Sequence, residues 1–253
     1  MKNKVKISVV TATWNSAHTL ADCLASIKQQ SYDNVEHVII DGASTDGTID
    51  LVNRHIGQIT TFKSEKDEGI YDALNKGICL TTGDVVGFLH ADDFYASKDV
   101  LSQVAKIFED SAVCAVYGDL EYVSKGDIGK VIRRWRGKPF NRHELGWGWM
   151  PAHPTLYVRR EWYLRIGDFD VNYRIAADYR SILKLFTLPG FKAVYIPEVL
   201  VTMRLGGSSN GSLAAIIRKT KEDWLALRSC GFPFFIAIRA IVWKNLSKLE
   251  QFL

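Results

Sequence analysis

Two adjacent carboxylates, Asp92 and Asp93, follow an apolar run that ends at Leu89. The run, residues 85–89, is typical of a strand that is buried on both faces of a sheet. Paired carboxylates at the end of such a strand suit a hard divalent cation, Mn²⁺ or Mg²⁺, that also holds a phosphate. The same two acids could instead only cap the helix that follows. The pair alone leaves both alternatives open.

The elements before this pair form a regular series. Apolar patterning predicts strands at residues 5–10, 35–40, 60–64 and 85–89, with amphipathic helices between them. Such alternation with short links favours an α/β fold with a mostly parallel, doubly wound sheet. Ligands bind outside the carboxyl ends of the strands in these sheets. The side chains that follow the four strands, and so share this edge, are Thr11, Trp14 and Asn15, then Asp41 and Asp46, then Glu65 and Asp67, then Asp92 and Asp93.

The second half of the chain is less regular. Strands are predicted at residues 114–123, 130–135, 155–158, 192–196 and 199–204, and a helix at 176–188. Two helices follow residue 213 and are separated near a Gly-Phe-Pro sequence at 231–233. We expect one continuous domain over residues 1–211, with halves at 1–120 and 121–211, and a helical appendage at 212–253.

Composition sets limits on function. The 253 residues carry 32 Lys and Arg against 28 Asp and Glu, a net charge of +4, which permits an anionic partner but does not require nucleic acid. The four scattered cysteines have no metal-binding spacing, which indicates free thiols in a reducing compartment. With no signal peptide pattern and no long apolar run, we expect a cytoplasmic protein. The dinucleotide, P-loop and nucleophile-elbow glycine motifs are all missing.

Four segments, taken in order, carry a family resemblance. Residues 7–15, 38–48, 64–77 and 90–93 closely resemble the family 2 glycosyltransferases of GT-A fold, and most of all the bacterial enzymes of surface-polysaccharide and O-antigen assembly. Residues 151–155 and 176–179 extend the likeness. The resemblance implies a nucleotide-sugar donor, a divalent cation, and an inverting transfer of a hexosyl group to a hydroxyl of a glycan acceptor. We expect the acceptor to be an oligosaccharide, in particular one linked to a polyprenyl diphosphate.

The resemblance also gives roles to residues. Asp93 matches the direct metal ligand and Asp92 the acid nearer the ribose or sugar, with His90 where the family has an acid or a small residue. The positions that match the nucleotide pocket are Asp41 at the base, Thr11, Trp14 and Asn15 on its other wall, and Asp67 near the ribose. Each has an alternative: a turn-forming Asp41, a core-filling Trp14, and an Asp67 that caps a helix at residues 68–80.

Three further positions match the acceptor half. Asp178 corresponds to the general base, although Ala177 replaces the usual Glu before it; the alternative is an acid that only favours a helix N-terminus. His153 could orient the acceptor or the base, but a lone loop histidine is more often structural. Arg204 matches a basic position that can meet the diphosphate, or is a solvated arginine.

The tail has its own pattern. A helical wheel places Arg239, Lys244 and Lys248 on one half and apolar residues largely on the other. This pattern suits an interfacial helix on an anionic membrane surface, at the inner face of the cytoplasmic membrane. The alternative is a helix packed on its own domain or on the second subunit of a homodimer.

Two other functions fit a similar sheet. A sugar nucleotidyltransferase would need a glycine-rich phosphate loop with Arg or Lys after the first strand, and residues 11–16 offer none. A catalytically inactive nucleotide- or glycan-binding module would lack the catalytic acids, which are present.

Overall fold

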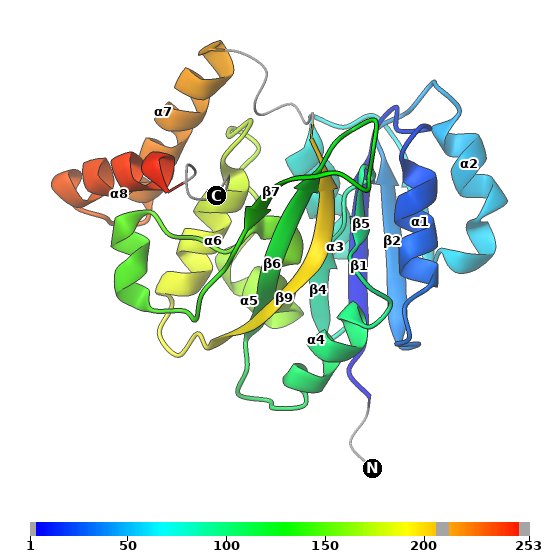
Figure 1. Cartoon of the computed structure of the whole chain (residues 1–253), viewed down its shortest axis with the longest axis horizontal. Helices are drawn as coiled ribbons and strands as arrows, with labels where there is room; N and C mark the ends of the chain where they lie inside the picture. The colour runs from blue at the N-terminus through cyan, green and yellow to red at the C-terminus, as the bar shows by residue number, and fades with distance from the viewer. Residues whose placement is uncertain (1–3, 206–212, 248–253) are drawn as a thin grey trace.

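The sheet that positions the site is built from nine strands. The computed structural model describes residues 4–205 and 213–247, and within them the strand order is β3-β2-β1-β4-β8-β6-β9-β5, with β7 paired to β6 (Figure 1). The first four strands are parallel: β1 (Ile7–Thr13), β2 (Val35–Asp41), β3 (Thr61–Ser64) and β4 (Val85–Phe88). The doubly wound arrangement expected for this half is confirmed.

Helices link these strands and cover both faces. They are α1 (Leu20–Lys28), α2 (Thr48–Arg54), the 3-10 turn η1 (Ile56–Gln58), α3 (Ile70–Leu80) and α4 (Val100–Phe108). Helix α3 lies directly on β1 and β2 because Gly77 has no side chain: a Cβ there would come within 2.3 Å of Val10. The sequence predicted α3 from residue 68, but the helix begins at Ile70.

The second half joins the same sheet with mixed strand directions. Its strands are β5 (Asp93–Tyr95), β6 (Ala115–Val123), β7 (Val131–Trp135), β8 (Tyr157–Arg159) and β9 (Ala193–Arg204). Strand β9 was predicted as two strands, which is wrong. The strand continues through Pro197 because Pro197 and Glu198 form a β-bulge and have no partners on β6. Gly118 pairs with Ile196, and the next residue, Asp119, pairs with Val199. The short strand β5 was not predicted.

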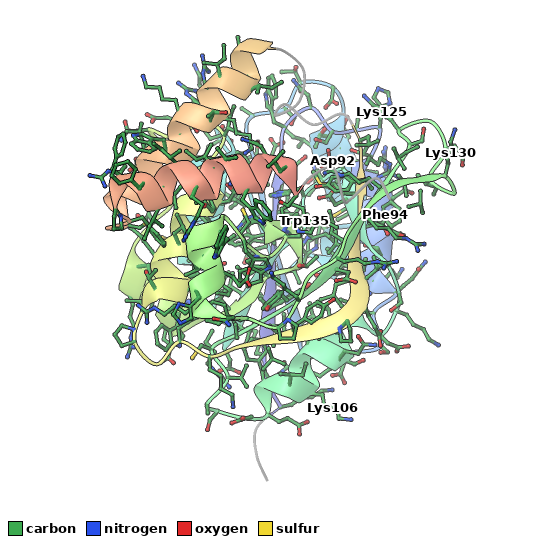
Figure 2. The ribbon with its side chains drawn as sticks, turned by 60° about the vertical axis from the view of Figure 1, so that its left-hand side comes forward. Asp92, Phe94, Lys106, Lys125, Lys130 and Trp135 are labelled. Carbon is green, nitrogen blue, oxygen red and sulfur yellow. The ribbon has the colours of Figure 1, made fainter. Side chains whose placement is uncertain are left out.

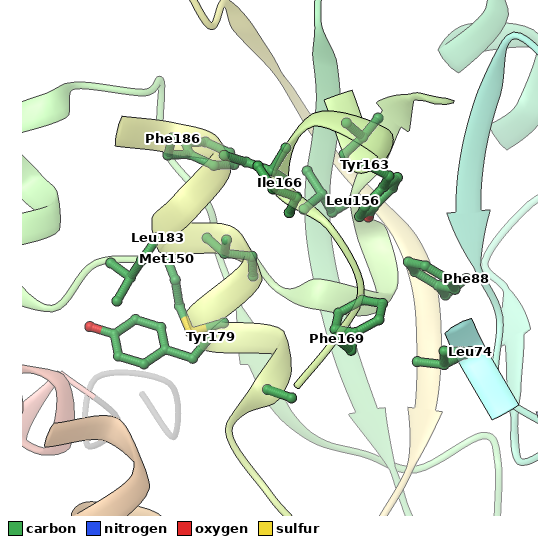
Figure 3. Packing of buried hydrophobic residues seen from close by; sticks show 14 of the residues in the cluster. Leu74, Phe88, Met150, Leu156, Tyr163, Ile166, Phe169, Tyr179, Leu183 and Phe186 are labelled. Atoms are coloured by element: carbon green, nitrogen blue, oxygen red, sulfur yellow. The ribbon is translucent and has the colours of Figure 1, made fainter. Parts of the chain in front are cut away.

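Two apolar cores lie on the two sides of the sheet. One holds α1, α2 and α4. The other surrounds α6 (Ala177–Thr187) and includes α5 (Arg160–Ile166) and the 3-10 turn η2 (Arg142–Trp147). The 3-10 turn η3 (His153–Thr155) contacts β4 and β6. Figure 3 shows Tyr179, Leu183 and Phe186 of α6 packed toward Met150 and Ile166. This second core fixes the start of α6, where Asp178 lies.

The two C-terminal helices pack on the domain. Helix α7 (Leu213–Ser229) contacts α6, and α8 (Phe234–Leu246) contacts α7 and η2, on the left of Figure 1. The inward face of α8 is made of Ala237, Ala240 and Lys244, all buried. Of the basic half of the predicted wheel, Lys244 is therefore buried, whereas Arg239 is exposed. Lys248 and the proposed boundary at residues 211 and 212 lie outside the described residues. No helix in residues 4–205 and 213–247 is long and apolar enough to cross a membrane.

Candidate active site

The carboxyl ends of β1, β2 and β3 form one edge, as the parallel register requires. Thr13 pairs with Asp41, and Asp41 pairs with Ser64, so the turns after these strands start side by side. A Cβ added to Gly42 would lie 2.6 Å from Asp67 Oδ2 and 3.3 Å from Trp14 Cδ1. Trp14, Gly42 and Asp67 therefore meet at this edge. Trp14 is 67% exposed, so it is not the core filler kept as its alternative, and its free indole face suits a planar ring.

The Asp41 carboxylate forms hydrogen bonds within the turn that follows β2 and with Ser64 at the end of β3. It is fully buried and accepts hydrogen bonds from Ser44 N (2.9 Å), the Ser44 hydroxyl and Ser64 Oγ (2.7 Å). This is the turn-forming role that the sequence left as the alternative. A contact between Asp41 and a nucleobase stays a prediction.

Asn15 and Thr11 contribute in different ways. Asn15 has a positive φ of 49° and accepts from Thr45 N (2.9 Å), while its own N–H donates to Ser44 Oγ (2.8 Å). These bonds join the turns after β1 and β2. Thr11 is fully buried, and its hydroxyl lies 3.0 Å from His37 Nε2. Thr11 therefore lies inside the sheet, below the proposed nucleotide pocket, and would support its wall without touching a ligand.

The position of Asp67 is compatible with both of its predicted roles, a cap at the start of α3 and a contact with the ribose. Its Oδ1 accepts from Gly69 N (2.9 Å), the residue that precedes α3, while Oδ2 is the atom near Gly42. One oxygen thus orders the entry to α3, and the other faces the shared edge. The predicted ribose contact of Asp67 is compatible with this placement.

Asp93 is the most unusual group of the site. Its side chain has no exposed surface, and neither carboxylate oxygen has a hydrogen-bond partner. Burial raises the pKa of Asp93 well above its ordinary value, and the negative charge of Asp92 raises it further, while Arg204 acts in the opposite direction. A buried carboxylate without a partner is costly unless a cation neutralises it. The donor set therefore fits a divalent cation.

Arg204 braces the loop that carries the two acids. It is 6% exposed, donates from Nη1 to the Asp92 carbonyl oxygen (2.8 Å), and forms an ion pair with Asp22 of α1. Its guanidinium also lies 5.1 Å from the centre of the Phe94 ring. The solvated alternative for Arg204 is wrong. Figure 2 shows Asp92 and Phe94 toward one end of the molecule, far from Lys106 of α4.

The protein supplies only part of a cation's coordination. The described residues contain no group of three or more His, Cys, Asp or Glu side chains that could hold a metal ion on their own. A cation at Asp93 would therefore take most of its ligands from diphosphate and water, as Mg²⁺ commonly does.

Asp178 lies in the first turn of α6, partly buried. Its Oδ1 accepts from Tyr179 N (2.7 Å), and the Tyr71 hydroxyl lies 3.3 Å away. Removal from water raises the pKa of Asp178, and the positive charge of Lys244 partly offsets this effect. A carboxylate whose pKa is raised toward the operating pH is suited to general base catalysis.

Carboxylates from both halves of the chain affect the same neighbouring side chains. The charges of Asp92 and Asp178 both act on His90, and the charges of Asp93 and Asp178 both act on Tyr122. Acids of the parallel half and of the acceptor half therefore act on the same two groups, His90 and Tyr122; that they form one site stays a prediction.

His153 lies deeper than its predicted role requires. It is 6% exposed, stacks on Phe88 (5.1 Å between ring centres), and lies 6.4 Å from the ring of His90. Burial lowers the pKa of His153 to about 3, so the ring is neutral. This placement favours the structural alternative, and orientation of an acceptor by His153 stays a prediction.

Some site residues had no signal in the sequence. Asp22 pairs with Arg204 across 182 positions, and Glu222 of α7 binds the loop before Asp178. Both depend on long-range packing, which local patterns do not encode. The turn around Ser44 was more accessible, because Asp side chains commonly accept hydrogen bonds from backbone N–H groups of their own turn.

Comparison with known proteins agrees with this geometry. The model of the family "Glycosyl transferase family 2" matches residues 8–167. A PGL/p-HBAD biosynthesis glycosyltransferase of Mycobacterium bovis (strain BCG / Pasteur 1173P2) is 33% identical over 208 residues, which span 80% of this chain and 78% of that protein. An uncharacterized glycosyltransferase of Nostoc sp. is 28% identical over 86% of this chain and 70% of its own length.

Solved structures show the same fold. The mannosyltransferase PcManGT from Pyrobaculum calidifontis, in complex with GDP-Man and Mn²⁺, superposes with a TM-score of 0.69 at 21% identity over 99% of this chain and 73% of its own. S. aureus TarS 1-349 in complex with UDP-GlcNAc also gives a TM-score of 0.69, at 15% identity over 95% of this chain and 71% of its own. With a GT-A-like sheet and a matched family model, this chain belongs to glycosyltransferase family 2.

Proposed function

We propose that this glycosyltransferase moves a hexosyl group from a nucleoside diphosphate sugar to a hydroxyl of a glycan acceptor. The single observation that carries the proposal is the fully buried, unpartnered Asp93 carboxylate, which follows β4, the parallel neighbour of the strand that leads to Trp14. A divalent cation held there would stabilise negative charge on the departing nucleoside diphosphate.

The residues of the chain would perform the remaining steps. Trp14 would face the base and Asp67 the ribose, which holds the donor at the strand ends. Asp178 would accept the proton of the acceptor hydroxyl as its oxygen attacks the anomeric carbon from the face opposite the phosphate. One such displacement inverts the configuration, in keeping with the family. Arg204 would keep the loop of Asp92 in place.

A donor screen tests this function. The purified chain is incubated with UDP- and GDP-linked hexoses, Mn²⁺ and a polyprenyl-diphosphate-linked sugar. We expect release of nucleoside diphosphate that depends on both Mn²⁺ and the acceptor. Release of pyrophosphate from a nucleoside triphosphate and a sugar phosphate would instead indicate a nucleotidyltransferase. Nucleotide binding without turnover of any donor would indicate an inactive module and contradict the proposal.

The C-terminal helices support a membrane-associated acceptor at the cytoplasmic face. The outward side of α8 exposes large apolar residues, with Phe235 81% exposed. The same two helices also expose four cations, namely Arg218, Lys221 and Arg228 of α7 and Arg239 of α8. The two acids in described residues 213–247, Glu222 and Asp223, are buried. Helices that expose large apolar side chains and cations, with both of their acids buried, are complementary to an anionic lipid surface. We therefore propose that α7 and α8 lie on anionic membrane and bring the site to a polyprenyl-linked acceptor.

Substitution of Phe235 tests the membrane contact without disturbing the packed face. We expect Phe235→Ser to reduce cosedimentation with phosphatidylglycerol vesicles by about tenfold, because a large buried side chain contributes about 1.5–3 kcal/mol. Ile56→Ser is the control, since Ile56 is an exposed apolar residue (50%) in η1, directly after α2, and α2 lies on the other side of the molecule (Figure 1). Unchanged sedimentation of the Phe235 variant would contradict the contact. Dissociation of a dimer by the same variant would assign the face to a second copy of the chain.

A further inference from the structure

The loop immediately before α6 is held by a carboxylate from another part of the chain. Glu222 of α7 accepts from three consecutive backbone N–H groups: Oε1 from Arg174 (3.1 Å), and Oε2 from Ile175 (2.8 Å) and Ala176 (2.9 Å). Glu222 is 7% exposed, so these bonds form away from bulk water. Charge-assisted bonds of this kind are roughly twice as strong as neutral ones. One side chain therefore fixes the backbone of residues 174–176.

This loop leads directly into the turn that carries Asp178. Ala176 is the N-cap residue of α6, and Asp178 is the second residue of the helix. Tyr71 of α3 holds the same loop from the other side, because its hydroxyl donates to the Ile175 carbonyl oxygen (2.7 Å). The N–H and the C=O of Ile175 are thus both held, by α7 and by α3. The backbone before Asp178 has little freedom to move relative to the edge of the sheet.

Helix α7 is in turn fixed to α8. The neighbour of Glu222, Asp223, forms ion pairs with Lys219 (2.7 Å) and with Lys244 of α8 (3.0 Å), and is 2% exposed. The Lys244 ammonium also lies 3.2 Å from the centre of the Tyr179 ring, next to Asp178. The C-terminal helices are thus connected to the acceptor half by buried charges as well as by apolar contact.

We propose that Glu222 is a positioning residue for Asp178, so that α7 is part of the active site and not an appendage to it. This inference rests on the proposed role of Asp178 as general base. Glu222 does not reach the reacting atoms in this arrangement; it acts by holding the loop at residues 174–176. Displacement of a catalytic group by about 1 Å can reduce a rate by up to about a hundredfold.

The test compares Glu222→Gln with a matched control. Glutamine keeps the shape but turns an NH₂ group toward backbone donors, so the loop loses part of its anchor. Glu36→Gln makes the same change at another buried carboxylate, which accepts from Thr82 N (2.7 Å) and Ser8 at the opposite edge of the sheet. We expect Glu222→Gln to lower kcat ten- to about a hundredfold with an unchanged donor KM. Glu36→Gln is expected to lower Tm without changing kcat.

A second measurement separates positioning from simple loss of stability. In the Asp178→Asn background, Glu222→Gln should cause no further loss of kcat, because the group that it positions is already inactive. Hydrogen exchange at residues 174–176 should become faster in Glu222→Gln and stay unchanged in Glu36→Gln. If Glu222→Gln does not fold, Glu222→Asp keeps the charge but shortens its reach and should show the same split between kcat and KM.

The outcomes distinguish the two proposals. Wild-type kcat in Glu222→Gln, together with an inactive Asp178→Asn, would overturn the positioning role and leave the proposed function intact. An equal loss of kcat in the presence and absence of Asp178 would also overturn it. Wild-type turnover in Asp178→Asn would overturn the role of Asp178 as base, and the positioning role with it.

Discussion

Asp93→Asn is expected to lower sugar transfer by at least about a hundredfold. Asparagine has nearly the same shape but no charge, so the cation that offsets the diphosphate charge loses its protein ligand, an interaction worth several kcal/mol. The measurement is acceptor-dependent release of nucleoside diphosphate over a range of Mn²⁺ concentrations. Raised Mn²⁺ should recover only a small part of the rate.

The same substitution should not weaken the fold. The wild-type carboxylate is buried without a partner, and its pKa is raised for that reason. Removal of its charge takes away a desolvation cost, so we expect the Tm of Asp93→Asn without metal to equal or exceed that of the wild type. Asp84→Asn is the control. Asp84 immediately precedes the first residue of β4, at the opposite end of that strand from the site, and this variant should retain its activity. Full transfer by the Asp93 variant would exclude the metal role.

Asp178→Asn is expected to lower kcat by about a hundred- to ten-thousandfold while donor affinity stays unchanged. Asparagine can still accept the hydrogen bond from Tyr179 N, so the turn is preserved, but it cannot take the proton of the acceptor hydroxyl. Donor affinity is measured by calorimetry with the nucleotide sugar and Mn²⁺. Asp168→Asn, an exposed acid in the preceding loop, is the control and should behave as wild type.

The raised pKa of Asp178 also predicts a pH dependence. A general base must be ionised to accept a proton. The value of kcat should therefore be at its maximum when the pH is above the pKa of Asp178, and should fall as the pH drops through that pKa. Because burial raises this pKa, the fall should begin at a higher pH than for an ordinary aspartate. The residual rate of Asp178→Asn should lack this limb. A wild-type profile without any acidic limb, or retention of the limb in the variant, would assign the base to another group.

The parallel half was predictable because its signals are local. Strands at the start of the chain alternate with amphipathic helices, and the parallel register alone places the residues after β1, β2 and β3 at one edge. The sequence places Asp93 just after the fourth strand, but it does not predict β5, the strand that Asp93 begins. What did not follow is its isolation: only the packing of β5 against β9, with Arg204 turned toward Asp22 and the Asp92 backbone, leaves both Asp93 oxygens without a partner.

The acceptor half was less predictable because its contacts are distant in the chain. The bulge at Pro197 hides the continuity of β9, since proline ordinarily ends a strand prediction. The tail gave a basic half on a helical wheel, yet Lys244 is buried against Asp223 and the apolar side is exposed. A helical wheel gives the relative positions of side chains but not which side faces the domain.

The central claim is that Asp93 and a bound diphosphate hold one divalent cation at the shared edge of the sheet. The most direct measurement is a crystal structure of the chain with Mn²⁺ and the nucleoside diphosphate released in the donor screen, with the metal located by anomalous diffraction. We expect one Mn²⁺ peak bonded to an Asp93 oxygen at about 2.2 Å and to oxygens of both phosphates, with the base beside Trp14. An ordered nucleotide whose Mn²⁺ lies away from Asp93, or a nucleotide at another surface, would contradict the claim.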